Sequence, residues 1–213
     1  MSPTPVVIVG CGGFGREVWA MVQALDTSKG SWCVEGFVDD CPSDAALVQV
    51  RALGSAVLGT VGDLAERRAP FAAVLAIGSP RARERVHAAL SSAPVRYPNV
   101  IHPDATVAAQ TFLGEGVVVA AGARLSTNVR IGDHVHLDQN VAVGHDTTIE
   151  AFSRLNPQAC VSGGVTVGRG ALVGANATIL QDLAVGPGAT VGAAACVVRD
   201  VPAGTVVKGV PAR

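Results

Sequence analysis

His145 and Asp146 stand side by side in the stretch "VAVGHDTTI". An imidazole has an unperturbed pKa of about 6.5, so at neutral pH it can remove a proton from an attacking nucleophile. A neighbouring carboxylate can fix the tautomer of the ring and stabilise the imidazolium that forms. The pair therefore predicts a general base and its orienting partner, although an Asp after an exposed His is also ordinary turn chemistry.

A six-residue repeat surrounds this pair and must position it. Aliphatic residues recur at every sixth position, without an insertion, from Val107 to Val197, and the residue that follows is often Gly. A fixed short period of this kind predicts a solenoid whose units bury their apolar side chains only by stacking on one another. Three such units can close one coil. Residues 18 apart would then lie in register on strands spaced ~4.8 Å apart.

The first hundred residues have a different texture. Apolar runs such as "VVIVG" and "AAVLAIG" alternate with helix-like stretches such as "GREVWAMVQAL" and "SPRARERVHAAL". This alternation is typical of a parallel sheet with crossover helices. Pro98 and Pro103 bracket the change of texture. We therefore predict an α/β, Rossmann-like domain over residues 1–100 and an all-β domain over residues 101–213.

The order of several motifs resembles one known family. The chain opens with "VVIVGCGGFGREV", continues with "GFVDD" and "AIGSPRAR", enters the repeat through "IHPDATV" and ends in "VPAGTVVKGVPAR". This order is similar to that of the hexapeptide-repeat sugar acyltransferases, which include sialic-acid O-acetyltransferases and bacterial nucleotide-linked 4-amino-sugar N-acetyltransferases. The resemblance spans essentially the whole chain. It implies a left-handed parallel β-helix, acetyl-CoA as acetyl donor, a nucleotide-sugar substrate, and a homotrimer with active sites between adjacent β-helices.

The predicted N-terminal domain carries a G-x-G-x-x-G loop between an expected strand and an expected helix. Bare backbone and a helix N-terminus suit a phosphate group. A dinucleotide cofactor is the usual interpretation, but the resemblance implies a sugar-nucleotide site, which we favour. The carboxylates of Asp39 and Asp40 can accept hydrogen bonds from ribose hydroxyls or a base edge, and a turn pair explains them equally well. Arg83 stands where the family tends to place an arginine, but solvation is an alternative for it and for its neighbours Arg81 and Arg85. The predicted sugar-nucleotide contacts are Gly10, Gly12, Gly13, Phe14, Gly15, Asp39, Asp40, Gly78 and Arg83, where Phe14 replaces a His that is frequent in the family.

The resemblance also implies contacts with acetyl-CoA. Gly163 lies 18 residues beyond His145 and matches the position of the family's acetyl-contact amide. A backbone N–H there would stabilise the oxyanion of the transition state. Small residues farther along would leave room for the pantetheine arm, and two cations near the end would meet the CoA phosphates. The predicted acetyl-CoA contacts are Gly163, Gly164, Ala175, Ala193, Lys208 and Arg213.

Arg154 is a departure from the family, which frequently carries a second His at this position. An Arg cannot serve as a base, but it can bind a carboxylate, a phosphate or a sugar hydroxyl. His136 lies 18 residues earlier and would occupy the same column one coil below. The two residues are therefore candidates for a changed acceptor site, or else only a surface column.

Composition and charge narrow the possible partners. Lys and Arg (16) nearly balance Asp and Glu (17), so no basic field favours nucleic acid or anionic lipid. The opening "MSPTPVVIVGCGG" has no cationic region, and its apolar run is too short for a signal or membrane segment. Five cysteines without a C-x-x-C pair predict free thiols in a reducing, cytoplasmic compartment.

The sequence therefore predicts an acetyl-CoA-dependent N-acetyltransferase of a nucleotide-linked amino sugar. Two alternatives are O-acetylation of sialic acid or a related sugar, and a non-catalytic β-helix that acts as a binding or scaffold protein. A third is a zinc site of His134, His136 and His145, since some hexapeptide β-helices are zinc-dependent carbonic anhydrases. The spacing does not match that family, and we predict no metal.

Overall fold

The computed structural model describes residues 4–29 and 32–213. The chain divides into two compact units, the first ending at His102 and the second spanning Pro103–Arg213. Among the described residues, no helix combines the length and the apolar character that a membrane span requires. All five cysteines are free thiols, as the sequence predicts.

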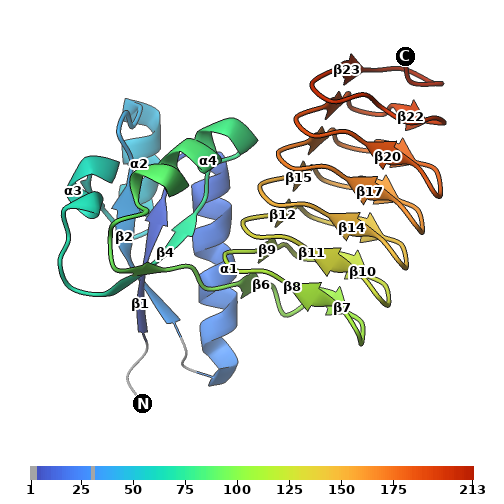
Figure 1. Ribbon diagram of the computed structural model, residues 1–213. Helices are drawn as coiled ribbons and strands as arrows, with labels where there is room; N and C mark the ends of the chain where they lie inside the picture. The colour runs from blue at the N-terminus through green and yellow to red at the C-terminus, as the bar shows by residue number, and fades with distance from the viewer. Residues whose placement is uncertain (1–3, 30–31) are drawn as a thin grey trace. The chain divides into compact units, whose positions relative to one another are not determined.

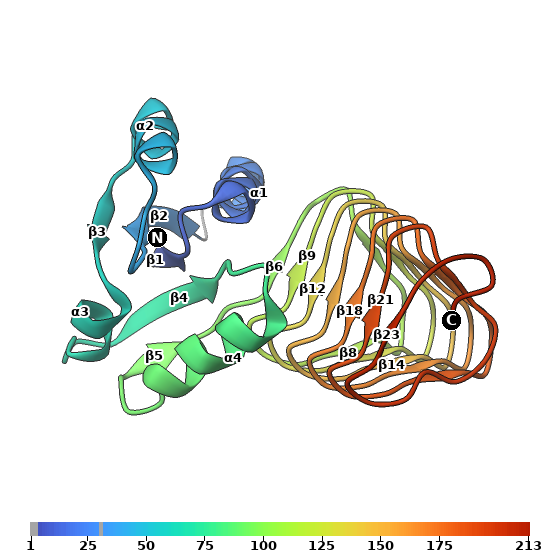
Figure 2. The same ribbon diagram turned by 90° about the horizontal axis from the view of Figure 1, so that it is seen from above.

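The first unit is built around a parallel sheet with strand order β3-β2-β1-β4-β5 (Figures 1 and 2). Its elements alternate along the chain as β1 (Thr4–Val9), α1 (Gly13–Lys29), β2 (Trp32–Val38), α2 (Asp44–Ala52), β3 (Val57–Gly59), α3 (Val61–Ala65), β4 (Phe71–Leu75), α4 (Pro80–Ala89) and β5 (Val95–Arg96). The two-residue β6 (Val100–Ile101) follows. This is the α/β, Rossmann-like architecture that the alternating texture predicts.

The central strands β1 and β4 are apolar on both faces because both faces are covered. Val7 and Val9 pack with Val61 and Leu64 of α3, and with Leu90 at the end of α4. Helix α1 lies on the opposite side of the sheet from α3 (Figure 2). Ligands of such sheets bind beyond the carboxyl ends of the strands, where the loops after β1, β2 and β4 lie.

The second unit is a left-handed parallel β-helix of two-residue strands joined by tight corners (Figure 1). Its strands stack into three sheets, β22-β19-β16-β13-β10-β7, β20-β17-β14-β11-β8, and β23-β21-β18-β15-β12-β9. The strands are β7 (Thr106–Val107), β8 (Phe112–Leu113), β9 (Val118–Val119), β10 (Arg124–Leu125), β11 (Arg130–Ile131), β12 (His136–Leu137), β13 (Ala142–Val143), β14 (Thr148–Ile149), β15 (Arg154–Leu155), β16 (Cys160–Val161), β17 (Thr166–Val167), β18 (Leu172–Val173), β19 (Thr178–Ile179), β20 (Ala184–Val185), β21 (Thr190–Val191), β22 (Cys196–Val197) and β23 (Val206–Val207).

The six-residue period and the 18-residue register both follow the sequence prediction. Leu125 pairs with Val143, which in turn pairs with Val161, and all three side chains are buried. The repeated aliphatic residue is the second residue of each short strand, so it fills the interior while the first residue faces outward.

One corner of the β-helix positions the His-Asp pair. Each coil turns there from the sheet that contains β13 to the sheet that contains β14, through a residue with a left-handed backbone. We call these residues the corner column: Gln110 (φ 63°), Asn128 (φ 54°), Asp146 (φ 59°), Gly164 (φ 70°) and Asp182 (φ 58°). Gly, Asn and Asp tolerate this conformation best, which explains most of the residue types in the column.

Candidate active site

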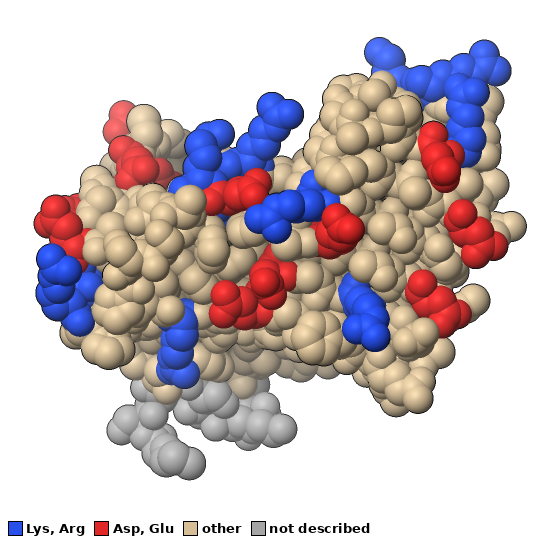
Figure 3. Space-filling view, viewed as in Figure 1, with Lys and Arg blue, Asp and Glu red and all other residues tan. Residues whose placement is uncertain are grey.

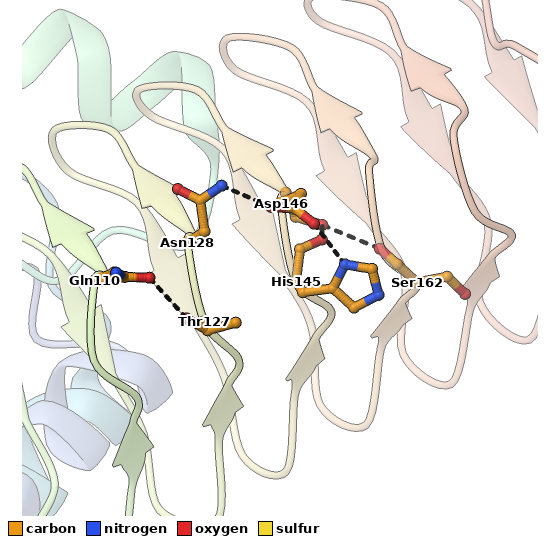
Figure 4. A network of polar contacts seen from close by, with 7 residues as sticks. Gln110, Thr127, Asn128, His145, Asp146 and Ser162 are labelled. Atoms are coloured by element: carbon orange, nitrogen blue, oxygen red, sulfur yellow. Dashed lines mark hydrogen bonds and ion pairs between the residues drawn. The ribbon is translucent and has the colours of Figure 1, made fainter.

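His145 and Asp146 form a direct side-chain contact at the corner after β13. The Nδ1 atom of His145 lies 2.7 Å from Oδ2 of Asp146 (Figure 4). An ionised carboxylate only accepts hydrogen bonds, so Nδ1 carries a proton, and in the neutral ring Nε2 is left as the acceptor. The side chains are 66% and 55% exposed, which leaves the ring accessible to a reactant. This tautomer is the one that a general base requires.

Gly163, one coil above, makes room for the imidazole ring. A Cβ added to Gly163 would lie 2.6 Å from Cε1 and 2.7 Å from Nε2 of His145. The ring therefore rests directly on the glycine backbone, and any larger residue would displace it. The packing of the His145 ring therefore explains the glycine at this position even without a bound ligand, in addition to the acetyl contact that the family resemblance implies.

Asp146 is held from the coil below. The side-chain amide of Asn128 donates a hydrogen bond to Oδ1 of Asp146 at 2.6 Å, and the backbone N–H of Asp146 donates to the Thr127 carbonyl at 3.3 Å. The bond from Asn128, followed by the bond from His145, holds the pKa of Asp146 below its ordinary value. The carboxylate is therefore ionised at neutral pH and can stabilise an imidazolium.

The backbone around the pair is fixed by hydrogen bonds between successive coils. Gly164 N–H donates to the carbonyl of His145 at 2.9 Å, and the buried Thr147 hydroxyl donates to the carbonyl of Ser162 at 3.0 Å. The Gly164 amide, one of the predicted acetyl-CoA contacts, is thus already engaged in coil stacking. By contrast, within residues 4–29 and 32–213 the Gly163 N–H donates no hydrogen bond.

Arg154 forms an ion pair that the sequence did not reveal. Its Nη2 and Nε atoms donate to Oδ2 of Asp138 at 2.7 and 3.1 Å, and the Asp138 side chain is 2% exposed. His136 pairs with Arg154 in register, one coil below, as predicted, but it is fully buried. The interpretation of these two residues as only a surface column is therefore wrong for His136.

The three histidines of the zinc alternative do not gather. His134 lies at a different corner, where its ring stacks on Phe152 at 5.1 Å between centroids. His134 and His136 are both buried, whereas His145 is exposed and bonded to Asp146. Among the described residues, these three side chains do not offer one common set of metal ligands.

The glycine-rich loop of the first unit combines two structural glycines with two open ones. Gly10 has a φ of 103°, and a Cβ on it would lie 2.8 Å from the Ala76 carbonyl oxygen. A Cβ on Gly15 would collide with the carbonyl oxygen of Gly10. Gly12 and Gly13 have no atom within 4 Å of an added Cβ, so they face open space. Phe14, at the start of α1, is half-buried.

Asp39 and Asp40 tie this loop region together. The two oxygens of Asp39 accept hydrogen bonds from the backbone N–H groups of Cys11 (2.9 Å) and Cys41 (3.0 Å). Oδ1 of Asp40 accepts from the N–H of Val61 at 2.7 Å, at the start of α3. Burial, then the Asp39 carboxylate, raise the pKa of the Cys11 thiol to about 11, so this thiol stays protonated.

A pocket of about 230 Å³ lies beside these aspartates, at the carboxyl ends of the strands. It brings together three of the predicted sugar-nucleotide contacts, Gly10, Asp39 and Asp40. Its other lining residues are Val9, Val38, Cys41, Val61, Ile77 and Val86. Gly12, Gly13, Phe14, Gly15, Gly78 and Arg83 lie outside this lining.

Arg83 is not solvated. It is fully buried, and its Nη1 donates a hydrogen bond of 2.7 Å to the carbonyl of Ile77. The guanidinium thereby supports the loop at Gly78, where β4 leads into α4. The structure corrects the interpretation of Arg83 as a surface side chain.

The last residues of the chain bring two predicted CoA contacts together. Lys208 and Arg213 exchange backbone hydrogen bonds of 3.0 and 3.1 Å, and both side chains are exposed. Lys and Arg side chains gather at this end of the β-helix (Figure 3). Ala175 and Ala193, earlier in the chain, lie in register on successive coils, the first half-buried and the second exposed.

Sequence reasoning missed Asn128 and Asp138, although each carries a contact of a candidate residue. The signal for Asn128 was present, because it stands 18 residues before Asp146 and so shares its column. Asp138 stands 16 residues before Arg154, off the exact register, and only the reach of the long arginine side chain connects them.

Comparisons with known proteins agree over almost the whole chain. Residues 5–90 match the family model of the PglD N-terminal domain. A GDP-perosamine N-acetyltransferase of Escherichia coli O157:H7 is 32% identical over 97% of this chain and 94% of its own length. The chain belongs to the family of hexapeptide-repeat N-acetyltransferases of nucleotide-linked amino sugars. The family resemblance seen in the sequence is therefore confirmed.

Solved structures of relatives give the same result. A mutant of perosamine N-acetyltransferase from Caulobacter crescentus, in complex with CoA and GDP-perosamine, is 32% identical with a TM-score of 0.87, and the match covers 98% of this chain and 95% of that one. The acetyltransferase domain of PglB from Neisseria gonorrhoeae FA1090, in complex with acetyl coenzyme A, is 31% identical with a TM-score of 0.86, over 100% and 99% of the two chains. The protein is thus an acetyl-CoA-dependent acetyltransferase. The alternative of a non-catalytic binding or scaffold protein is therefore wrong.

Proposed function

We propose that this acetyltransferase transfers the acetyl group of acetyl-CoA to the amino group of a GDP-linked 4-amino sugar such as GDP-perosamine. The observation that carries the proposal is the 32% identity, over almost the full length of both chains, to a GDP-perosamine N-acetyltransferase. The His145–Asp146 contact supplies the base that such a transfer uses.

In the proposed reaction the amine lone pair attacks the thioester carbonyl carbon, and the carbonyl electrons move onto oxygen. Nε2 of His145 accepts the proton that the amine loses, and Asp146 stabilises the imidazolium. The Gly163 N–H is a donor for the oxyanion. The carbonyl then re-forms, the C–S bond breaks, and the imidazolium returns its proton to the CoA thiolate.

We further propose that the nucleotide binds to the first unit and CoA to the β-helix. For the nucleotide, the support is the pocket beside Gly10, Asp39 and Asp40, together with the open backbone at Gly12 and Gly13. For CoA, the support is the exposed pair of cations, Lys208 and Arg213. A homotrimer and a cytoplasmic site of action, both expected from the sequence, belong to the same proposal.

An acceptor screen tests the proposed substrate. Thiol release from acetyl-CoA would be measured with GDP-perosamine, with a UDP-linked 4-amino sugar and with free sialic acid, and the products analysed by mass spectrometry. We expect release with the GDP sugar and an N-acetylated product. Release only with the UDP sugar would correct the nucleotide, and release only with sialic acid would favour O-acetylation.

A further inference from the structure

Asn128 contacts the His-Asp pair from a different coil. It occupies the corner column one coil below Asp146, at a φ of 54°, and its side chain is exposed. Figure 4 shows its amide pointing along the column toward the Asp146 carboxylate, at 2.6 Å. Since a carboxylate cannot donate, the amide nitrogen must be the contacting atom, so the orientation of the amide is fixed by chemistry.

The two oxygens of Asp146 have separate partners. Oδ1 accepts from Asn128 and Oδ2 accepts from Nδ1 of His145. A rotation of the carboxylate would break at least one of these charge-assisted bonds. Because both side chains of the pair are more than half exposed, packing alone does not hold them in place. The bond from Asn128 is therefore a main restraint on the carboxylate.

We propose that Asn128 is a positioning residue for acetyl transfer, which fixes Asp146 so that His145 presents Nε2 as the proton acceptor. This inference rests on the proposed function of His145. Asn128 does not touch the reacting atoms and acts through Asp146. The lowered pKa of Asp146, with the Asn128 bond as its largest cause, is consistent with this role.

The backbone at position 128 decides which variants are informative. Because φ is positive there, Ala would add backbone strain, whereas Gly removes the side chain without strain and Asp keeps its shape. Asn128→Gly deletes the anchor. Asn128→Asp replaces the donor by a second carboxylate that repels Asp146 at pH 8. Gln110→Gly is the matched control, because Gln110 shares the column and its side chain accepts from the Thr127 hydroxyl (3.3 Å) without reaching the pair.

Kinetics of the full-length protein with GDP-perosamine and acetyl-CoA provide the first readout. We expect both Asn128 variants to lower kcat by about tenfold, which corresponds to the free energy of one hydrogen bond to a charged group. The KM for acetyl-CoA should be unchanged. Gln110→Gly should keep the wild-type kcat. In a His145→Ala background, Asn128→Gly should cause no further loss, because its effect passes through the imidazole. An equal loss in both backgrounds, or an equal loss in Gln110→Gly, would overturn the positioning role.

The ring tautomer provides a second readout that needs no substrate. In ¹⁵N-histidine NMR spectra, with the His145 signal assigned from the His145→Ala variant, the wild type should show protonated Nδ1 and unprotonated Nε2 above neutral pH. Asn128→Gly should give a mixture of tautomers. An unchanged tautomer would contradict the inference even if the acceptor sugar proves wrong, whereas an inactive wild type with the predicted tautomer shift would contradict only the proposed function.

Discussion

Two aspartates, one in each unit of the chain, each accept two hydrogen bonds but have different roles. Asp39 accepts from the backbone N–H groups of Cys11 and Cys41, so it joins two loops. Asp146 accepts from two side chains, Asn128 and His145, so it joins an amide to the imidazole of the candidate base. The partners of the carboxylate, more than the carboxylate itself, separate a structural role from a chemical one.

The pKa values of the two aspartates are lowered by the same two kinds of partner, backbone N–H groups for Asp39 and side chains for Asp146. Burial alone would raise the pKa of Asp39, but the backbone N–H groups of Cys11 and Cys41 outweigh it and hold that pKa below its ordinary value. The pKa of Asp146 is also lowered, by the Asn128 side chain first and by His145 second. Both carboxylates are thus anions at neutral pH, but of these two only Asp146 contacts an imidazole, whose protonated form it can stabilise.

Among the variants that test this comparison, replacement of Asp146 is expected to lower kcat most. Asp146→Asn would keep the shape but offer an amide where Nδ1–H needs an acceptor, which favours the wrong tautomer of His145. We expect kcat to fall by about 100-fold or more, with little change in the melting temperature. Steady-state kinetics and thermal unfolding check this. A variant with near wild-type kcat would place Asp146 in the same structural class as Asp39.

Gly163→Ala is expected to have the next largest effect. The added Cβ would enter the space of the His145 ring and push it from its seat, while the backbone hydrogen bonds of the coil stay in place. We expect kcat to fall by about tenfold, because a small displacement of a base is costly. Gly170→Ala is a control for an added methyl group at another corner of the β-helix, where the Cβ meets no atom within 4 Å. It is the harsher change for the backbone, because φ is positive at Gly170 (66°) and not at Gly163. Equal losses of kcat in the two variants would mean that a general disturbance of the β-helix, and not the displaced ring, is responsible.

Asp39→Asn should have the smallest effect on kcat, because Asp39 lines the proposed nucleotide pocket and does not touch the reacting groups, and it should lower the stability of the fold. The amide would turn a donor toward one of two backbone N–H groups, and the free energy of unfolding should fall by about 1–3 kcal/mol. Since the folded pKa of Asp39 is lowered, its stabilisation is complete above its unfolded pKa of about 3.9 and is lost as pH falls through the folded value. Urea unfolding at several pH values would test this, and a loss of kcat at saturating substrate would contradict it.

The β-helix was predictable from the sequence because one residue pattern, repeated in every unit, forms its core. An aliphatic residue at every sixth position fixes the strands, the register and even the column that Asp146 shares with Asn128. The handedness came only from the family resemblance, since the period fits either hand. The contact between His145 and Asp146 was foreseeable because the residues are neighbours in the chain.

The contacts that escaped prediction depend on side-chain direction and reach. The bond from Asn128 to Asp146 requires both rotamers to point along the column, which a period does not specify. The Arg154–Asp138 pair spans two positions that are out of register by two residues. The burial of Arg83 depends on how α4 packs on its sheet, and its charged side chain resembles those of its exposed neighbours in sequence.

The turnover of His145→Ala with acetyl-CoA and GDP-perosamine tests most directly whether this corner performs acetyl transfer. We predict that kcat falls by about two orders of magnitude or more, that acetyl-CoA binding measured by calorimetry is nearly unchanged, and that the melting temperature stays close to that of the wild type. If the wild-type enzyme is active in the same assay and the variant has the same kcat, the assignment of His145 as the base is contradicted.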